Sequence, residues 1–381
     1  MSRKAKMRVL VDARGLLENQ KAGVEGYTLQ MLYNLKRMYP KDEYILFSYA
    51  RKKQPIDSIK KDFQWIHYKW PNIAASLMWR YGQWPKVNHL VKNIDVVWNP
   101  NIRFMPATKE VKQVATVHDL SFVTMKECFR LQSRFWHWYM AIEKNLQKMD
   151  AIVAVSRSTA QDIAKYYRID NCKIKTIYPG LSESVVDSDG FIIEDLNVRT
   201  EEYFLHVGTM EYRKNIKLCL VAYQKMINIW QKKGIKNIPR FVLVGGKGWT
   251  YDKEIDQIIK QIGKKRVIKM GYVDEKQKNI IIQNALGLFY PSFYEGFGFP
   301  PLEALMTGVP VVASMGGSLG EVLGSEAILL DPFDTNGVMK TMDMLINKKI
   351  FGQPKSKWIE KYKWEKSAEF FHQTLEQVWQ K

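Results

Sequence analysis

The chain has 381 residues, 46% of them hydrophobic and 13% aromatic, which is enough for two packed cores and excludes disordered, collagen-like and coiled-coil proteins. Its 58 lysines and arginines outnumber 39 acidic residues, so the formal net charge is +19 at pH 7. Such a charge attracts phosphates, on a nucleic acid, an anionic lipid or a diphosphate substrate. Three scattered cysteines with no CxxC pair exclude a disulfide framework and a zinc knuckle.

No run of 18 apolar residues is present, so we expect no membrane-spanning helix. The basic start of the chain is followed by an apolar stretch too short for a secretory leader. We therefore expect a cytoplasmic protein, and the charge adds the expectation of peripheral contact with the inner face of an anionic membrane.

Short β-branched segments alternate along the chain with helix-length amphipathic segments, which predicts an α/β fold with parallel sheets covered on both faces. The first half contains predicted strands at residues 7–11, 43–49, 95–99, 112–117, 151–155 and 173–178. The second half contains predicted strands at residues 203–207, 240–244, 266–270, 287–290, 309–313 and 327–330. Each half is therefore predicted to form a doubly wound domain.

The acidic, turn-rich segment Gly180–Thr200 separates the two halves and is predicted to be a hinge. The predicted domains are residues 1–185 and 201–355, with a linker at 186–200 and a helical C-terminal segment at 356–381. In doubly wound sheets, ligands bind outside the carboxyl ends of the strands. Chemistry-bearing residues are therefore expected directly after the predicted strands.

The loop after the first predicted strand carries Gly23 and Gly26 before a predicted helix. Its length and the absence of a leading close glycine make it a poor match to a dinucleotide fingerprint, so a NAD site is disfavoured. Close approach of the backbone to a phosphate at Gly23 stays open. Glu25 would place a carboxylate beside that phosphate.

His118 follows the predicted strand at residues 112–117, where it could hydrogen-bond a reacting sugar. A lone histidine is more often structural than catalytic. The other five histidines, among them His206, have no comparable position. The adjacent Asp119 is expected to cap the following turn.

Arg213 and Lys214 follow the strand at residues 203–207 and a turn at Gly208, before a helix predicted to begin near Asn215. The planar guanidinium and the lysine point charge suit a diphosphate that gains negative charge as it leaves. The alternative is a solvated basic loop. The position after a strand favours the binding site.

The strand ending at Tyr290 is followed by a glycine-rich loop that contains Glu295, Gly296, Phe297 and Gly298. Pro300 and Pro301 predict the first turn of a helix, and Glu303 is expected in that turn. The glycines and the helix start favour an anionic group, and two carboxylates beside it are suited to sugar or ribose hydroxyls. The alternative for Glu303 is stabilisation of the helix dipole.

Aromatic and basic residues are concentrated in segments 69–86 and 130–148. The second has helical spacing and is predicted to face the core. In the first, Trp79, Arg80, Tyr81 and Trp84 are harder to bury together, and a bilayer contact or a stacking surface for a sugar would suit them.

Together these segments resemble the retaining glycosyltransferases of family 4, which have the GT-B architecture of two Rossmann-like domains facing a cleft. The resemblance runs from Met7 to the C-terminal helix, and the runs VGTMEYRKN and VGGKGWTYDKEI are most similar to mannosyltransferase-type members that build bacterial surface polysaccharides. It implies that the N-terminal domain binds the acceptor, that the C-terminal domain binds the nucleotide sugar, and that the last helix crosses back to the first domain.

The resemblance also implies roles for residues. Glu295 would bind donor-sugar hydroxyls, Glu303 the ribose, and Arg213 and Lys214 the diphosphate. The remaining donor contacts would come from the loop residues Gly23, Gly208, Gly296, Phe297 and Gly298. His118 would orient the donor sugar, and fixed cations would stabilise the leaving group with no cofactor or metal.

The implied activity is transfer of mannose or another hexose from a nucleotide diphosphate sugar to a glycan or a lipid-linked acceptor. Two alternatives stay open: a nucleotide-sugar epimerase or phosphorylase of the same fold, and a basic protein that binds nucleic acid or membrane. Nucleic acid is not an expected partner, because the cations are spread along the chain and no base-reading module is present.

Overall fold

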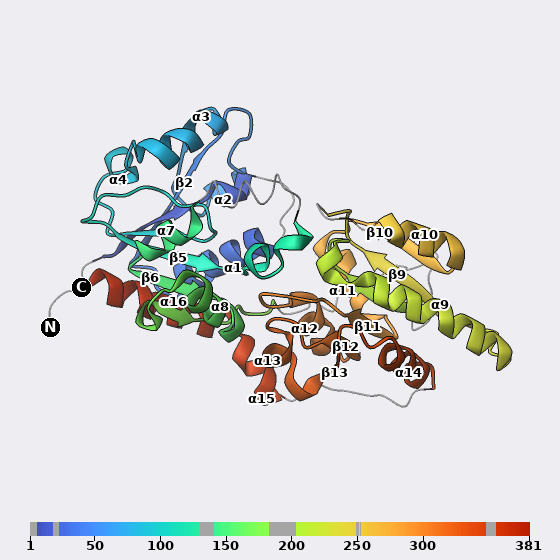
Figure 1. The fold of residues 1–381 in the computed structure, drawn as a ribbon. Coiled ribbons are helices and arrows are strands. Elements are labelled where there is room, and N and C mark those ends of the chain that lie inside the picture. Colours follow the sequence, from blue (N-terminus) through green and yellow to red (C-terminus); the bar gives the residue numbers. More distant parts are fainter. Residues whose placement is uncertain are drawn as a thin grey trace. The chain divides into compact units, whose positions relative to one another are not determined.

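The computed structural model of the protein describes residues 6–17, 23–129, 141–182, 203–248, 251, 253–347 and 356–381. These residues divide into two compact units (Figure 1). The first takes its residues from Met1–Leu120, Phe135–Gly180 and Lys361–Lys381, and the second from Ser121–Arg134 and Leu181–Glu360. The linker predicted at 186–200 lies outside the described residues, as do the domain ends predicted at residues 185 and 355.

The first unit contains a seven-stranded parallel sheet in the order β3-β2-β1-β4-β5-β6-β7. Its strands are β1 (Arg8–Asp12), β2 (Glu43–Tyr49), β3 (Trp65–Tyr68), β4 (Val96–Asn99), β5 (Lys112–Val117), β6 (Ala151–Ala154) and β7 (Ile174–Thr176). All six predicted strands are confirmed, and the edge strand β3 was not predicted. The central register pairs Leu10 with Ile45 on one side and Val97 on the other, and all three side chains are fully buried.

Helices cover both faces of this sheet. They are α1 (Gly23–Met38), α2 (Asp57–Lys60), α3 (Asn72–Leu77), the π-helical turn η2 (Met78–Gly82), α4 (Val87–Leu90), α7 (Ile142–Gln147), α8 (Arg157–Tyr167) and α16 (Trp364–Trp379), with 3-10 turns η1 (Gly15–Leu17) and η4 (Asn171–Lys173). The predicted core face of segment 130–148 lies partly outside the described residues. Within them, Ile142 and Leu146 are buried.

The second unit contains a six-stranded parallel sheet in the order β10-β9-β8-β11-β12-β13. Its strands are β8 (Tyr203–Val207), β9 (Arg240–Val244), β10 (Val267–Gly271), β11 (Gly287–Tyr290), β12 (Val311–Ser314) and β13 (Ile328–Leu330), which confirms all six predictions. Its helices are α5 (Ser121–Thr124), α9 (Ile216–Lys232), α10 (Lys253–Ile262), α11 (Glu275–Gln283), α12 (Phe299–Met306), α13 (Leu319–Leu323), α14 (Thr335–Ile346) and α15 (Ser356–Ile359), with 3-10 turns η3 (Lys126–Cys128), η6 (Tyr212–Lys214) and η7 (Gly324–Glu326). The 3-10 turn η8 (Glu360–Tyr362) spans the boundary between the two units along the chain.

The C-terminal helix α16 belongs to the first unit, as predicted (Figure 1). It packs along α1 and buries Phe371 and Leu375 completely. Polar contacts fix its position: His372 Nε2 lies 2.7 Å from Asp42 Oδ2, and the Ser367 hydroxyl donates to the Tyr178 carbonyl at 2.6 Å. The end of the chain is therefore part of the first core.

Each sheet reverses its strand order at one point, between β1 and β4 in the first unit and between β8 and β11 in the second. The loops that leave two such strands diverge to opposite faces of the sheet and open a crevice at the carboxyl edge. Residues in the loops after β8 and β11 are thus placed where a ligand is expected. Among the described residues, no helix has both the length and the hydropathy needed to cross a bilayer.

Candidate donor-binding site

The site in the second unit is built from the loop after β8 and the loop after β11. Arg213 and Lys214 lie on the 3-10 turn η6, directly before α9, and Glu295 lies on the loop between β11 and α12. The two loops are joined by the Phe293 N–H, which donates to the Arg213 carbonyl at 2.8 Å. Both arise at the reversal point of the sheet, so the sequence-distant residues are brought together by the topology.

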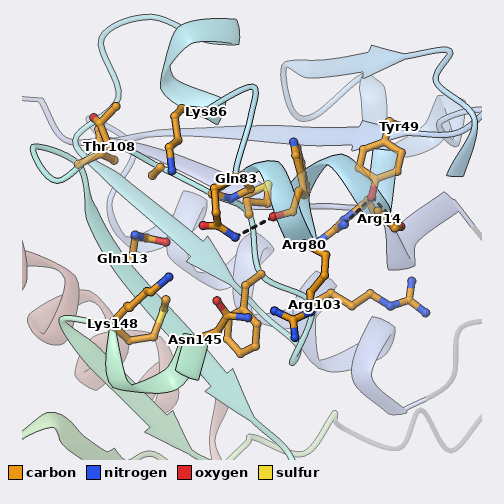
Figure 2. A pocket seen from close by; sticks show the side chains of 18 of the residues that line it. Arg14, Tyr49, Arg80, Gln83, Lys86, Arg103, Thr108, Gln113, Asn145 and Lys148 are labelled. Carbon is orange, nitrogen blue, oxygen red and sulfur yellow. Dashed lines mark hydrogen bonds between the residues drawn. The ribbon is translucent and has the colours of Figure 1, made fainter. Parts of the chain in front are cut away.

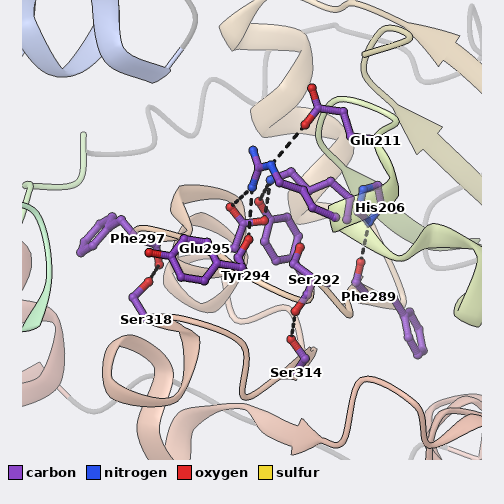
Figure 3. A network of polar contacts seen from close by, with 12 residues as sticks. His206, Glu211, Phe289, Ser292, Tyr294, Glu295, Phe297, Ser314 and Ser318 are labelled. Carbon is purple, nitrogen blue, oxygen red and sulfur yellow. Dashed lines mark hydrogen bonds and ion pairs between the residues drawn. The ribbon is translucent and has the colours of Figure 1, made fainter. Parts of the chain in front are cut away.

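Glu295 is paired with both predicted cations (Figure 3). Lys214 Nζ donates to Glu295 Oε1 at 2.6 Å, and Arg213 Nη1 donates to Glu295 Oε2 at 3.0 Å. Lys214 also donates to the Tyr290 hydroxyl at 2.7 Å, and Arg213 Nε donates to Glu211 at 3.1 Å. Lys214 and Glu295 are each only 6% exposed, so this is a buried charge network and not a solvated basic loop.

The charges of this network determine its protonation states. Burial by itself raises the pKa of Glu295, but Lys214 and Arg213 outweigh that effect and lower the pKa to about 2. Burial and the neighbouring Arg213 lower the pKa of Lys214, while Glu295 opposes the shift. A fixed cation pair beside an ionised carboxylate can hold a phosphate oxygen and a hydroxyl side by side.

The loop that carries Glu295 is hydrogen-bonded to the turn between β12 and α13. The Ser318 N–H donates to the Glu295 carbonyl at 2.9 Å, and the Ser318 hydroxyl donates to the Phe297 carbonyl at 3.0 Å. Gly317 has φ 61°, and a Cβ there would lie 2.3 Å from the Glu295 carbonyl oxygen, so only glycine allows this approach. These supporting residues were not predicted, because they lie in the turn that follows the next strand along the chain.

Gly298 is the N-cap of α12, with φ 102°. Phe299, Pro300 and Pro301 then form the first turn, as predicted for the prolines. The prediction that Glu303 lies in this turn is wrong: it is the fifth helical residue, because the helix begins at Phe299 and its first turn contains no acidic residue. Glu303 therefore cannot act mainly by stabilising the helix start.

We expect Gly298→Ala to destabilise the protein by about 1–3 kcal/mol, because the residue needs a left-handed conformation and its Cβ would lie 2.7 Å from Leu319 Cδ2. Gly320→Ala in α13 is the matched control, since no atom lies within 4 Å of its Cβ position. Urea denaturation measures both. Equal unfolding free energies for the two variants would contradict the conclusion that position 298 requires glycine.

Glu303 faces α11, where Lys278 Nζ donates to its Oε1 at 2.9 Å. The second carboxylate oxygen, Oε2, is buried and has no hydrogen-bond partner within the described part of the chain. Glu303 lines a small pocket together with Ser182, Asn279 and Thr307. Burial raises the pKa of Glu303 and Lys278 partly offsets this. A buried carboxylate oxygen without a donor is suited to a ligand hydroxyl.

His206, which the sequence did not single out, lies at the end of β8 beside the cation pair. Its Nδ1 is 2.9 Å from the Phe289 carbonyl, so Nδ1 carries the proton, and burial lowers the pKa to about 4. The other nitrogen, Nε2, is a buried acceptor that no described residue donates to. A Cβ on Gly208 would lie 3.5 Å from Nε2 and 3.6 Å from Lys214 Cε, so the Gly208 backbone passes directly beside both groups.

The remaining predicted residues, Gly23 and His118, lie in the first unit. Gly23 begins α1, and no atom lies within 4 Å of its Cβ position. His118 packs edge-on against Tyr27 of α1 with ring centroids 4.8 Å apart, and its Nε2 is 2.8 Å from the Pro100 carbonyl. Burial lowers its pKa, so the ring is neutral at pH 7 with Nδ1 as an acceptor.

Two Rossmann-like units with parallel sheets, and a buried cation pair at the reversal point of the second, define the GT-B class of protein. Solved structures agree with this fold. The sucrose-phosphate synthase from Thermosynechococcus elongatus superposes with a TM-score of 0.75 over 98% of this chain and 99% of that chain, at 17% identity. The Anabaena HepE structure in complex with UDP and glucose gives a TM-score of 0.65 over 98% and 97%, at 15% identity.

Family models cover both halves of the chain. "Glycosyltransferase Family 4" matches residues 22–184, and "Glycosyl transferases group 1" matches residues 189–364. The N-terminal part of the chain thus matches the family 4 model and the C-terminal part the group 1 model, so both halves are glycosyltransferase domains, as the sequence motifs indicate.

Mannosyltransferases of bacteria are among the similar curated proteins. The O-antigen chain mannosyltransferase B of Escherichia coli is 30% identical over 246 residues, which are 63% of this chain and 62% of that protein. The serotype-specific mannosyltransferase WbdA of Escherichia coli is 27% identical over 251 residues, which are 63% of this chain and 30% of that protein. The chain thus matches less than two thirds of the length of these relatives.

Proposed function

We propose that the protein is a retaining glycosyltransferase that moves mannose, or another hexose, from a nucleotide diphosphate sugar to a glycan or lipid-linked acceptor during surface-polysaccharide synthesis. The observation that carries the proposal is the buried Arg213–Lys214–Glu295 network at the reversal point of the second sheet. The mannosyltransferase relatives support the sugar class and the process. Neither the site nor the comparisons favour an epimerase, a phosphorylase or a nucleic-acid-binding protein.

In the proposed reaction the bond between the anomeric carbon and the diphosphate oxygen breaks while the acceptor hydroxyl attacks from the same face. The hydroxyl proton passes to the leaving phosphate oxygen. Negative charge grows on the diphosphate in the transition state, and Arg213 and Lys214 stabilise it more than they stabilise the ground state. The loop residues Gly296, Phe297 and Gly298 and the start of α12 add backbone dipoles at the same group.

Two carboxylates and His118 bind the sugars in this proposal. Glu295 accepts hydrogen bonds from donor-sugar hydroxyls, and the unpartnered Oε2 of Glu303 accepts one from the ribose. His118, through its Nδ1, orients the donor sugar, and Gly23 and Gly208 allow the phosphates to approach the backbone. We propose that the two fixed cations take the place of a metal, so transfer proceeds in EDTA.

The test is a panel of UDP-, GDP- and ADP-sugars, assayed for thermal stabilisation and slow hydrolysis with and without EDTA. We expect one nucleotide diphosphate sugar to stabilise the protein and to be turned over equally in both conditions. Product formed without any acceptor, as an epimer of the donor, would overturn the proposal, and so would the absence of binding by every donor.

Lys278→Met is expected to raise the donor KM about tenfold near pH 6. Without Lys278, Glu303 loses the cation that favours its ionised form. A hydrogen bond from the ribose to a charged carboxylate is worth about 1.5–3 kcal/mol, and this contribution weakens when Glu303 is neutral. Removing Lys278 raises the pKa of Glu303 further, so the loss of donor affinity on acidification moves to higher pH. The exposed Lys276→Met on the same helix is the control. Superimposable profiles of KM against pH would exclude a role for Glu303 in donor binding.

A further inference from the structure

The first unit contains a cavity of about 700 Å³ that the donor site does not explain (Figure 2). It extends over one face of the sheet, from Tyr49 at the end of β2 to Asp150 before β6. Seven cations line it, namely Arg14, Lys53, Arg80, Lys86, Arg103, Lys109 and Lys148. Asp150 is the one acidic residue among the described lining residues. The volume is in the range of small-molecule sites.

The positive charge of the cavity is only partly neutralised within the protein. Arg14 is paired with Asp12 at 2.6 Å, and Asp150 is paired with Lys112 at 3.7 Å. Lys86, Arg103 and Lys148 form no ion pair with any described acidic residue. Burial and the charge on Lys148 both lower the pKa of Lys86, which shows that these two ammonium groups repel each other across the cavity. An anion between them would relieve this repulsion.

Trp79 lines the same cavity and carries a buried N–H donor. Trp79 is 4% exposed, and its indole N–H has no hydrogen-bond acceptor among the residues that the structure describes. The ring packs edge-on against Tyr49, with centroids 5.1 Å apart, and the Arg14 guanidinium lies over both rings. Gln83, Gln113 and Asn145 add polar groups around the cavity (Figure 2). The cavity therefore presents N–H donors and cations, which suits a ligand rich in oxygen acceptors.

The segment that forms one wall of this cavity also carries an exposed apolar stripe. Residues 72–82 are helical, and Asn72, Ser76, Trp79, Arg80 and Gln83 line the cavity at helical spacing. The neighbouring positions Ile73, Leu77, Tyr81 and Trp84 are 79%, 43%, 69% and 62% exposed, and we call these four the apolar stripe. Large apolar side chains exposed together beside cations are typical of a surface that contacts lipid.

We propose that the cavity binds the phosphate or diphosphate group of a lipid-linked saccharide, and that the apolar stripe holds the hydrocarbon chain at the bilayer surface. A lipid phosphate is the ligand whose two parts match the two neighbouring surfaces of segment 72–84. The proposal rests on the proposed function, because sugar transfer is what identifies this ligand as the acceptor. The proposal identifies the acceptor as a lipid-linked saccharide, which the donor site alone does not specify.

The test is calorimetric titration of the full chain, with the donor site saturated by the nucleoside diphosphate found in the panel above. The probes are farnesyl diphosphate, inorganic pyrophosphate and farnesol. We expect farnesyl diphosphate to bind at least about tenfold tighter than either of the others, since each of them lacks one of the two matching parts. Equal binding of pyrophosphate and farnesyl diphosphate would point to a free phosphate ligand and would overturn the lipid assignment.

Variants locate the binding. Lys86→Gln with Lys148→Gln is expected to weaken farnesyl diphosphate and pyrophosphate at least about tenfold, whereas Leu77→Ser with Tyr81→Ser should weaken farnesyl diphosphate alone. Lys41→Gln with Lys61→Gln, exposed in the same unit and outside the cavity, makes the same charge change and should have no effect. Unchanged binding in the Lys86 and Lys148 variant would overturn the site.

A vesicle sedimentation assay distinguishes binding of a lipid-linked diphosphate from binding of ordinary lipid headgroups. Phosphatidylcholine vesicles containing a polyisoprenyl diphosphate should sediment the protein, and the Lys86 and Lys148 variant should release it. Equal capture by phosphatidylglycerol vesicles with no polyisoprenyl diphosphate would overturn the proposal. These readouts need no turnover, so their failure leaves the donor panel intact. The vesicle assay needs no donor-site ligand, so it stays interpretable if the donor panel fails.

Discussion

Lys214→Met is expected to lower kcat for sugar transfer about 10²–10³-fold, the loss typical of removing one fixed group that stabilises transition-state charge. The ammonium is buried and held at 2.6 Å from Glu295 and 2.7 Å from the Tyr290 hydroxyl, so it needs no reorganisation to meet a leaving diphosphate. The methionine side chain keeps most of the volume. Initial-rate kinetics with varied donor measure kcat and KM separately.

The fold should survive this change, because Arg213 still pairs with Glu295 at 3.0 Å. Lys217→Met is the matched control: Lys217 lies on the next helix, α9, half exposed and paired with Glu254 at the surface. We expect its kcat to stay within about twofold of the parent, as is usual for surface ion pairs. A kcat for Lys214→Met as high as that of Lys217→Met would show that Lys214 does not act on the leaving group.

Glu295→Gln is expected both to abolish transfer and to destabilise the protein by about 3–5 kcal/mol, because two buried cations lose their carboxylate. The pKa of Glu295 is lowered to about 2 in the folded state, below its ordinary value of 4.5. Its contribution to stability is therefore complete above about pH 4.5 and is lost as pH falls toward 2. Urea unfolding from pH 7 to pH 3 should show this component in the parent and not in the variant.

A double variant separates structure from function at Glu295. Lys214→Met with Glu295→Gln removes one charge of each sign, so part of the lost stability should return while transfer stays absent. Glu254→Gln, whose carboxylate pairs with Lys217 at the surface, is the control for loss of one carboxylate. A kcat of the double variant as high as that of Lys214→Met alone would show that Glu295 has a purely structural role.

The fold could be predicted from the sequence because its parallel strands are short β-branched runs with clear turn boundaries. The strand that was missed, β3, has only four residues, all of them half-buried, and pairs with β2 alone at the edge of the sheet. An edge strand does not need the apolar run that marks a buried one. The position of β3 is determined by its pairing with β2 and not by a local pattern in its own sequence.

The candidate site could be predicted in part. Arg213, Lys214 and Glu295 stand in loops after predicted strands, and the topology brings them within hydrogen-bond distance. Their direct pairing was not predicted, since spacing along the chain does not report it. Lys278 is likewise 25 residues from its partner Glu303, and Ser318 is 23 residues from Glu295. Such supporting contacts depend on the packing of neighbouring βα units.

The most direct test of the site is calorimetric binding of the nucleoside diphosphate and the nucleoside monophosphate of the preferred base. We expect the diphosphate to bind at least about tenfold tighter, because the second phosphate reaches the cation pair. In the Arg213→Met and Lys214→Met double variant this difference should disappear, while monophosphate binding is retained. Parent-like preference for the diphosphate in that variant would contradict a diphosphate site at Arg213 and Lys214.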